Sequence, residues 1–317
     1  MNHLILSSLL PVVLLISLGW LAGHRQWIGA ASVKDLSNLV FLLLSPALLF
    51  RAMSQVHVEQ LNLKPVAAYF LAAGLIFAGT LLVRGFNRTA AVLGMANTYS
   101  NLVMIGIPLV GLAYGPEGMV TLLTLVSLHA LVMLTTATVA VELAVAREDA
   151  QSGGPQHHMA VLVWQAVRNA VVHPVPIPIL AGLLFAQTGW TIPAVVDTPL
   201  MLLGQAFGPL ALVMVGVTLA QNRIGPHLHG AMGLALVKNL LHPLLVVAIG
   251  WLLGLGGLPL TVMVVAASLP MGANVFLFAQ RYQVKQELIT ASVAVSTLLA
   301  LITVSACLLY TSDAADE

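Results

Sequence analysis

Long apolar stretches, each about the length of a membrane crossing, follow one another along almost the whole chain. A helix needs roughly 20 apolar residues to cross the ~30 Å hydrocarbon core of a bilayer. Of the 317 residues, 59% are hydrophobic and 7% are charged, a composition that soluble domains do not have. We therefore predict an all-α polytopic membrane protein with ten spans, near Leu4–Ala22, Val33–Met53, Leu63–Val83, Thr89–Tyr114, Met119–Ala146, Val171–Gly189, Pro193–Gln221, Gly230–Leu255, Leu258–Tyr282 and Glu287–Leu309.

Charges at the ends of these stretches predict the orientation. The first stretch lacks a basic residue before it and a small-residue cleavage site after it, which favours a retained span over the alternative, a removable signal peptide. With the N-terminus outside, only Arg51 and Lys64 fall on the outer side, and Lys238 lies inside a span. Nine basic residues then fall on the cytoplasmic side: Arg25, Lys34, Arg84, Arg88, Arg147, Arg168, Arg223, Arg281 and Lys285. The positive-inside rule favours this orientation, with a cytoplasmic central loop.

Two of the stretches are interrupted near mid-membrane by polar and helix-breaking residues. They read Asn97-Thr-Tyr-Ser-Asn101-Leu-Val-Met-Ile-Gly106-Ile-Pro108 and Ser268-Leu-Pro270-Met-Gly272-Ala-Asn274-Val-Phe276. Lipid offers no partner to freed backbone groups, so broken helices survive at this depth only where protein covers them or a cavity lies beside them. Paired breaks at corresponding places in two halves predict the binding site of a carrier.

The hydrophilic segment from Arg147 to His158 divides the ten spans five and five. An odd number of spans per half makes the second half enter the membrane from the opposite side, as an inverted repeat requires. We accordingly divide the chain into a first five-span repeat (1–146), a cytoplasmic loop (147–160), a second five-span repeat (161–306) and a tail (307–317). The tail, with the only cysteine, Cys307, resembles the translation of a sequencing adapter, and a native polar tail is the alternative.

Helix N-termini at the breaks predict a site for small anions. A helix begins with unpaired N–H groups and about half a positive charge. If spans four and nine cross at their breaks, two such termini can face one cavity without an arginine or lysine. The predicted substrate-binding residues are the amide donors Asn101 and Asn274, with Gly106, Pro108, Pro270 and Gly272 in the broken backbone. Alternatively, the prolines only kink their helices and the asparagines bond to neighbouring spans.

The two break segments carry a resemblance to a known family, the auxin efflux carriers, which covers nearly the whole chain up to the tail. The family includes the plant PIN-formed auxin exporters and bacterial carriers of malonate and similar acids. The resemblance implies ten spans in two inverted repeats with helices four and nine crossing at the substrate site, so Asn101 and Pro270 carry over as site residues. It also implies a bacterial inner-membrane carrier, and it leaves a homodimer open. The chain departs from the family pattern at Ser100, where plant members have proline, and at Ala170, which replaces the proline of an Asn-Pro pair.

Ionisable residues inside spans are functional suspects because each costs energy in lipid. Lys238 could attract the anion or pair with Glu142, or its long stem could carry the ammonium to the cytoplasmic boundary. His129, near mid-depth, is either a neutral hydrogen-bonded histidine or a proton relay. The pair His157-His158 lacks further ligands at metal spacing, so we predict no metal site and no cofactor.

These observations favour a secondary carrier over two other classes of protein. A membrane-embedded enzyme would need a nucleophile with its base, a metal cluster or paired carboxylates, and the motifs for these and for an ATP-driven pump are absent from the sequence. A sensor would need a soluble domain. We predict export of mono- or dicarboxylates such as malonate by alternating access at the crossing of helices four and nine. A sodium- or proton-coupled symporter of the bile-acid type is the alternative.

Overall fold

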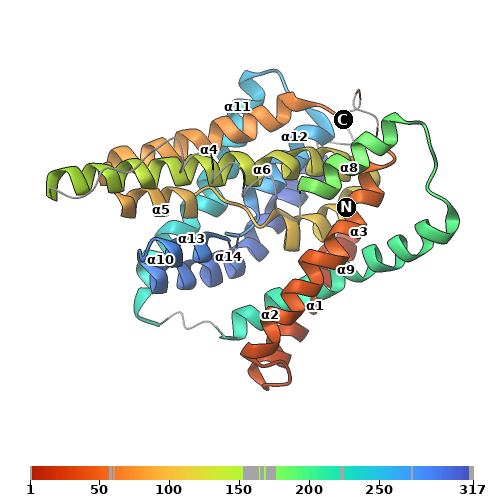
Figure 1. Cartoon of the computed structure of the whole chain (residues 1–317), viewed down its shortest axis with the longest axis horizontal. Helices are drawn as coiled ribbons and strands as arrows, with labels where there is room; N and C mark the ends of the chain where they lie inside the picture. The colour runs from red at the N-terminus through yellow and green to blue at the C-terminus, as the bar shows by residue number, and fades with distance from the viewer. Residues whose placement is uncertain are drawn as a thin grey trace.

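The computed structural model describes residues 2–56, 59, 61–152, 164, 168, 176–221, 225–272 and 274–313, and within these ranges helices are joined by short turns and loops (Figure 1). In the first half the elements are α1 Asn2–His24, α2 Ala30–Leu39, η1 Val40–Leu44, α3 Ser45–Met53, α4 Leu63–Arg84, α5 Arg88–Ala96, η3 Leu102–Gly106 and α6 Ile107–Ser152. In the second half they are α8 Pro176–Gln187, α9 Ala194–Gln221, η4 Gly225–His227, α10 Leu228–Leu236, η5 Val237–Leu241, α11 His242–Leu252, α12 Gly257–Ser268, α13 Asn274–Arg281 and α14 Gln286–Asp313.

Six helical runs among the described residues are long and apolar enough to cross a membrane: Ser32–Met53, Leu63–Arg84, Leu102–Glu148, Ala194–Gln221, Gly225–Leu252 and Gln286–Leu308. Three shorter apolar helices, Leu10–His24, Ile177–Gln187 and Gly257–Ser268, overlap the first, sixth and ninth predicted spans. The prediction of an all-helical, multi-pass membrane protein is therefore confirmed.

The predicted fourth and fifth spans meet inside one assigned helix, α6. The break between them is local, because Gly115 has the non-helical torsions φ 58° and ψ −152° and is followed by Pro116. Glycine tolerates this positive φ, and a proline can begin the next helix. Beyond this point α6 continues to Ser152, past the predicted span end at Ala146. The histidine pair and the Asn169-Ala170 pair lie outside the described residues.

Among the described residues, the π-helical segments η1, η3 and η5 have a common sequence cause. Each ends one residue before an X-Pro pair that begins the next helix: Ser45-Pro46, Ile107-Pro108 and His242-Pro243. A proline inside a helix lacks an N–H, and its ring clashes with the carbonyl four residues earlier. Widening the preceding turn to a π-helix relieves that clash. Two of these wide turns, η3 and η5, lie next to the site described below.

Helices of the first half pack against helices of the second. The helix α1 crosses α9, and α3 lies against α8 and α9, so that these helices gather at one side of the molecule (Figure 1). The α1–α9 crossing is a backbone contact, because a Cβ on Gly19 would overlap the Val213 carbonyl and one on Gly216 the Ile16 carbonyl. The rest of the molecule is built from α4, α5, α6 and α10–α14, among which α4 packs on α11. Small residues permit such close approach between membrane helices.

Candidate functional site

The two break segments lie against each other as a short antiparallel bridge. Ser100 pairs with Met271, the N–H of Asn101 donates to the Pro270 carbonyl at 2.8 Å, and the N–H of Gly272 donates to the Tyr99 carbonyl at 3.0 Å. These bonds satisfy backbone groups that the broken helices leave free. A side chain does not fit at position 272, because a Cβ there would lie 2.8 Å from the Tyr99 ring and 3.2 Å from the Ser100 carbonyl oxygen.

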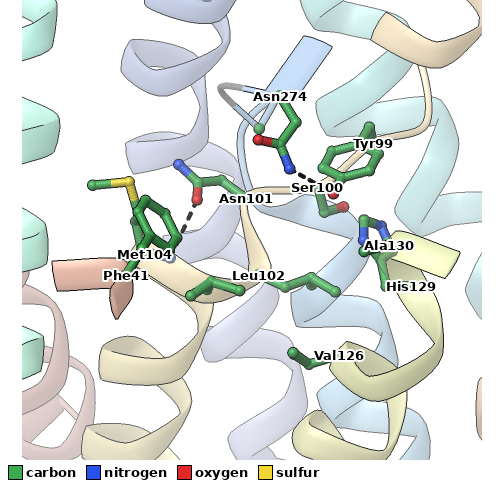
Figure 2. A pocket seen from close by; sticks show the side chains of 12 residues that line it. Phe41, Tyr99, Ser100, Asn101, Leu102, Met104, Val126, His129, Ala130 and Asn274 are labelled. Atoms are coloured by element: carbon green, nitrogen blue, oxygen red, sulfur yellow. Dashed lines mark hydrogen bonds between the residues drawn. The ribbon is translucent and has the colours of Figure 1, made fainter. Parts of the chain in front are cut away.

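A cavity of about 50 Å³ lies beside this bridge (Figure 2). One water needs about 10–15 Å³ of such volume, so the cavity holds a few waters or a small carboxylate. Its walls come from the first break, the second break, η1 and α6. The lining residues are Phe41, Tyr99, Ser100, Asn101, Leu102, Val103, Met104, Val126, His129, Ala130, Gly272 and Asn274.

Both predicted amide residues stand at helix starts on this cavity. Asn101 is the N-cap of η3, where its side-chain oxygen accepts from the Met104 N–H at 3.3 Å. Asn274 is the first residue of α13, and its amide nitrogen donates to the Tyr99 hydroxyl at 2.9 Å. Figure 2 shows the Asn101 amide nitrogen turned away from the capping bond, and no hydrogen bond among the described residues engages it. Two helix N-termini and neutral amides thus border one small cavity, which suits an anion.

The far wall of the cavity is a buried polar cluster. Tyr69 of α4 shares a 2.8 Å hydrogen bond with the Ser100 hydroxyl and a 3.3 Å hydrogen bond with His129 Nε2. The His129 ring also lies against the Tyr99 ring, with centroids 4.5 Å apart. All four residues are buried, so the cluster fixes the first break by packing as well as by hydrogen bonds.

Lys238 lies behind the second break, in η5, with no exposed surface. Its ammonium donates to the carbonyls of Ala267 at 2.6 Å and Leu269 at 2.8 Å. The neighbouring Asn239 donates to the carbonyl between them, that of Ser268, at 3.1 Å. The ammonium therefore does not extend to the membrane boundary. Glu142, a partner considered from the sequence, instead accepts from the Tyr282 hydroxyl at 2.9 Å.

The other predicted site residues lie around the bridge rather than on the cavity. Pro270 borders a separate apolar cavity of about 20 Å³ with Val12 and Ile105. Gly106 faces Leu269, whose Cδ1 would lie 2.8 Å from an added Cβ, and Pro108 packs near Gly208 of α9. The structure thus brings Asn101, Asn274 and Gly272 together on the cavity. Pro270, Gly106 and Pro108 belong to the backbone around it.

A larger cavity of about 590 Å³ shares Phe41, Met104 and Asn274 with the small one. At its other end it is bordered by the exposed residues Lys34 and Asn38. The small cavity is therefore next to a wide space that is bordered by exposed residues of α2.

Several residues on the cavity were not predicted. Tyr99 and Ser100 lie within the first break segment, but nothing distinguished them there from their polar neighbours. Phe41 on the cavity, and Tyr69 behind the lining residues Ser100 and His129, come from helices remote in sequence, and their apolar surroundings carry no local signal. Only the signal that found Asn101, polarity beside a helix break at membrane depth, was available from the sequence.

Comparison with known proteins gives one consistent result. Residues 4–308 match the family model described as membrane transport protein. A Rhizobium meliloti (strain 1021) protein named "Putative malonate transporter" is 31% identical over 317 residues, covering 96% of this chain and 95% of that protein. The Escherichia coli (strain K12) "Uncharacterized transporter YfdV" is 25% identical over 303 residues, covering 92% and 93%. "Auxin efflux carrier component 8" of Arabidopsis thaliana is 23% identical over 347 residues, covering 94% of each chain.

Proposed function

The chain belongs to the membrane transport protein family, which includes the auxin efflux carriers, and from that premise we propose that it is a secondary carrier of small organic anions. It is a transporter and not an enzyme. The substrate class we propose is mono- and dicarboxylates, with malonate as the first candidate because of the Rhizobium relative's name.

The observation that carries this proposal is the cavity at the crossing of the breaks. It combines the N-termini of η3 and α13 with the amides of Asn101 and Asn274, and no arginine or lysine is among its lining residues. Partial charges and neutral donors can hold a carboxylate without the strong binding that a buried ion pair would give. A carrier must release its substrate, so moderate binding fits transport better than storage.

We propose that the two halves form an inverted repeat around this crossing. Its first support is the spacing of two hydrogen-bonded pairs. Tyr69 bonds to Ser100 in the first half and Lys238 bonds to Leu269 in the second, and the two residues of each pair are 31 positions apart. The second support is packing. If α1 corresponds to α8 and α3 to α9, the contact of α1 with α9 corresponds to that of α8 with α3. The contact of α4 with α11 joins two corresponding helices. With five spans in each half, this arrangement would have ten spans.

We propose further that the N-terminus lies outside the cytoplasm and that the structure represents a form open to the cytoplasm. With the orientation that the charges favour, the 590 Å³ cavity bordered by Lys34 opens inward. The apolar space beside Pro270 and Val12, about 20 Å³, lies on the outer side and admits no carboxylate. Export then begins with the loading of substrate from the inside, at a lysine that attracts anions to the entrance.

The test is transport by the purified protein in liposomes against a panel of mono-, di- and tricarboxylates, with auxin as one aromatic member. Uptake or counterflow of small dicarboxylates above protein-free vesicles is the expected result. If no carboxylate is transported or bound while a cation or a neutral solute is, the proposed substrate class is wrong. The same vesicles, with and without sodium and a pH gradient, distinguish a uniporter from the sodium- or proton-coupled alternative.

A further inference from the structure

The buried ammonium of Lys238 has an unusual set of partners. Isolated charges at membrane depth are costly, and they usually pair with an opposite charge. None of the ion pairs among the described residues includes Lys238. Its partners are instead two carbonyls at the C-terminal end of α12, where a helix carries about half a negative charge. The half-helix dipole and two charge-assisted hydrogen bonds therefore take the place of a carboxylate.

A chain of hydrogen bonds leads from the same helix end to the bridge between the breaks. Asn239 directs its amide nitrogen to the Ser268 carbonyl, and its oxygen accepts from the Ser296 hydroxyl at 2.6 Å. Ser296 in turn accepts from the N–H of Met271, in the bridge between the breaks, at 3.0 Å. Lys238, Asn239 and Ser296 are all fully buried. Two backbone carbonyls thus bind the ammonium, and Asn239 and Ser296 connect the same helix end to the bridge between the breaks.

This is the kind of place where a cation-coupled carrier binds its ion. In broken-helix transporters, unwound carbonyls and half-helix C-termini coordinate the coupling sodium or proton. We propose that the Lys238 ammonium is a tethered cation that fills such a position here, so that the crossing is held in its binding-competent form without a mobile ion. The part of this inference that concerns transport rests on the proposed function. Lys238 is then a positioning residue, which acts on the site through α12 and the bridge.

The first half lacks the equivalent charge. At the corresponding position, Tyr69 directs a neutral hydroxyl to Ser100 and His129. Of these two corresponding positions, that of Lys238 directs a cationic group to backbone carbonyls, so we expect its side chain, and not that of Tyr69, to be replaceable by a small free cation. Tyr69 is the matched control.

The experiment measures the melting temperature of the purified Lys238→Ala and Tyr69→Ala variants in methylammonium and in equal concentrations of tetramethylammonium. Methylammonium can donate to the vacated carbonyls, whereas tetramethylammonium has the same charge and no N–H group. We expect Lys238→Ala to melt below the wild type and to regain stability as methylammonium rises, as a bound ligand requires. Tyr69→Ala should lose stability and show no difference between the two ions. An equal response of Lys238→Ala to both ions overturns the inference.

Two further arms cover the remaining outcomes. If Lys238→Ala does not fold well enough to melt, the same two ions are compared during expression and purification, and a higher folded yield in methylammonium supports the inference while equal yields contradict it. Wild-type transport should not change when sodium is replaced by N-methylglucamine, and a requirement for sodium also contradicts it. If the wild type transports no carboxylate but Lys238→Ala binds methylammonium, only the proposed substrate class fails.

Discussion

At the scale of single residues, the candidate site depends on a few residues that each hold the backbone and also border the cavity. Asn101 caps η3 through its oxygen, which leaves its amide nitrogen outside the capping bond, and the residue borders the cavity. Asn274 begins α13 and is held by the Tyr99 hydroxyl. Gly272 leaves room for the Tyr99 ring to lie against the bridge. A substitution at any of these positions therefore changes the shape and the donors of the cavity together.

The two asparagines give the most direct test of the site. Asn101→Ser keeps an oxygen that can cap a helix and removes the amide donor, so it should abolish or strongly weaken transport at near-normal thermal stability. Asn274→Ala should also lose transport, with a stability cost of about 0.6 kcal/mol for one amide hydrogen bond between membrane helices. Substrate counterflow in liposomes and melting in detergent are the two measurements.

The matched control is Asn87, which caps α5 through a 2.9 Å bond to the Ala90 N–H and lies away from the cavity. Asn87→Ala should cost about 1 kcal/mol, as lost caps do, without a loss of transport beyond that expected from lower stability. Normal transport by both site variants would move the substrate site away from this cavity.

The sequence contains part of this residue-scale information and not the rest. Asn101 and Asn274 could be found because amides beside helix breaks are conspicuous in apolar sequence. The partners of Lys238 could not be predicted, because the long side chain of a lysine in a span can reach several kinds of polar partner. Which one it reaches depends on the helix end that lies opposite, here that of α12. Likewise Tyr69 became visible as a site neighbour only through its contact with Ser100.

At the scale of elements, the π-helical turns lie next to prolines, and the close contact of α1 with α9 lies at glycines. The sequence predicted the breaks at Pro270 and near Asn101, because these interruptions are encoded locally. It did not predict the π-helical form of η1, η3 and η5, since a proline can also kink a helix or end it. It also did not predict the contact of Gly19 and Gly216, which requires the crossing of two distant helices.

The α1–α9 crossing gives a prediction at this scale. Gly216→Val inserts a side chain where the Ile16 carbonyl lies, so it should destabilise the protein by about 1–3 kcal/mol or separate the two helices. Gly74→Ala in α4 is the control, because a Cβ there meets no atom within 4 Å and alanine favours a helix by about 0.5–1 kcal/mol. Melting of both variants in detergent distinguishes the cases, and equal stability would mean that α1 and α9 do not touch at Gly216.

At the scale of the whole molecule, orientation determines what the cavities mean. If the N-terminus is outside, the α1–α2 turn lies in the cytoplasm and the α8–α9 turn lies outside. In a Cys307→Ser background, Ser32→Cys and Thr191→Cys place exposed thiols at these two turns. An impermeant maleimide added to intact spheroplasts should label position 191 and reach position 32 only after lysis. Labelling of position 32 in intact spheroplasts would contradict the orientation and make the 590 Å³ cavity an outward opening.

The last prediction concerns energy. A net-negative substrate that crosses without a cation experiences the membrane potential directly, with about 2.3 kcal/mol per charge per 100 mV, and an inside-negative potential drives it outward. A substrate jump on a solid-supported membrane should therefore give a current that persists without sodium and with equal pH on both sides. A current that requires a pH gradient would instead assign a proton role to His129, and one that requires sodium would identify the symporter.

The unequal pair Tyr69 and Lys238 bears on how such a molecule could have arisen. If the halves descend from one five-span protein that assembled as an antiparallel pair, both copies carried the same residue at this position. Two lysines would then have placed two ammonium groups behind the same crossing, since Tyr69 now packs against the ring of His242, four residues after Lys238. Like charges at that depth repel strongly. On such a descent, a single lysine at the crossing requires that the two copies could first mutate independently, as gene duplication allows.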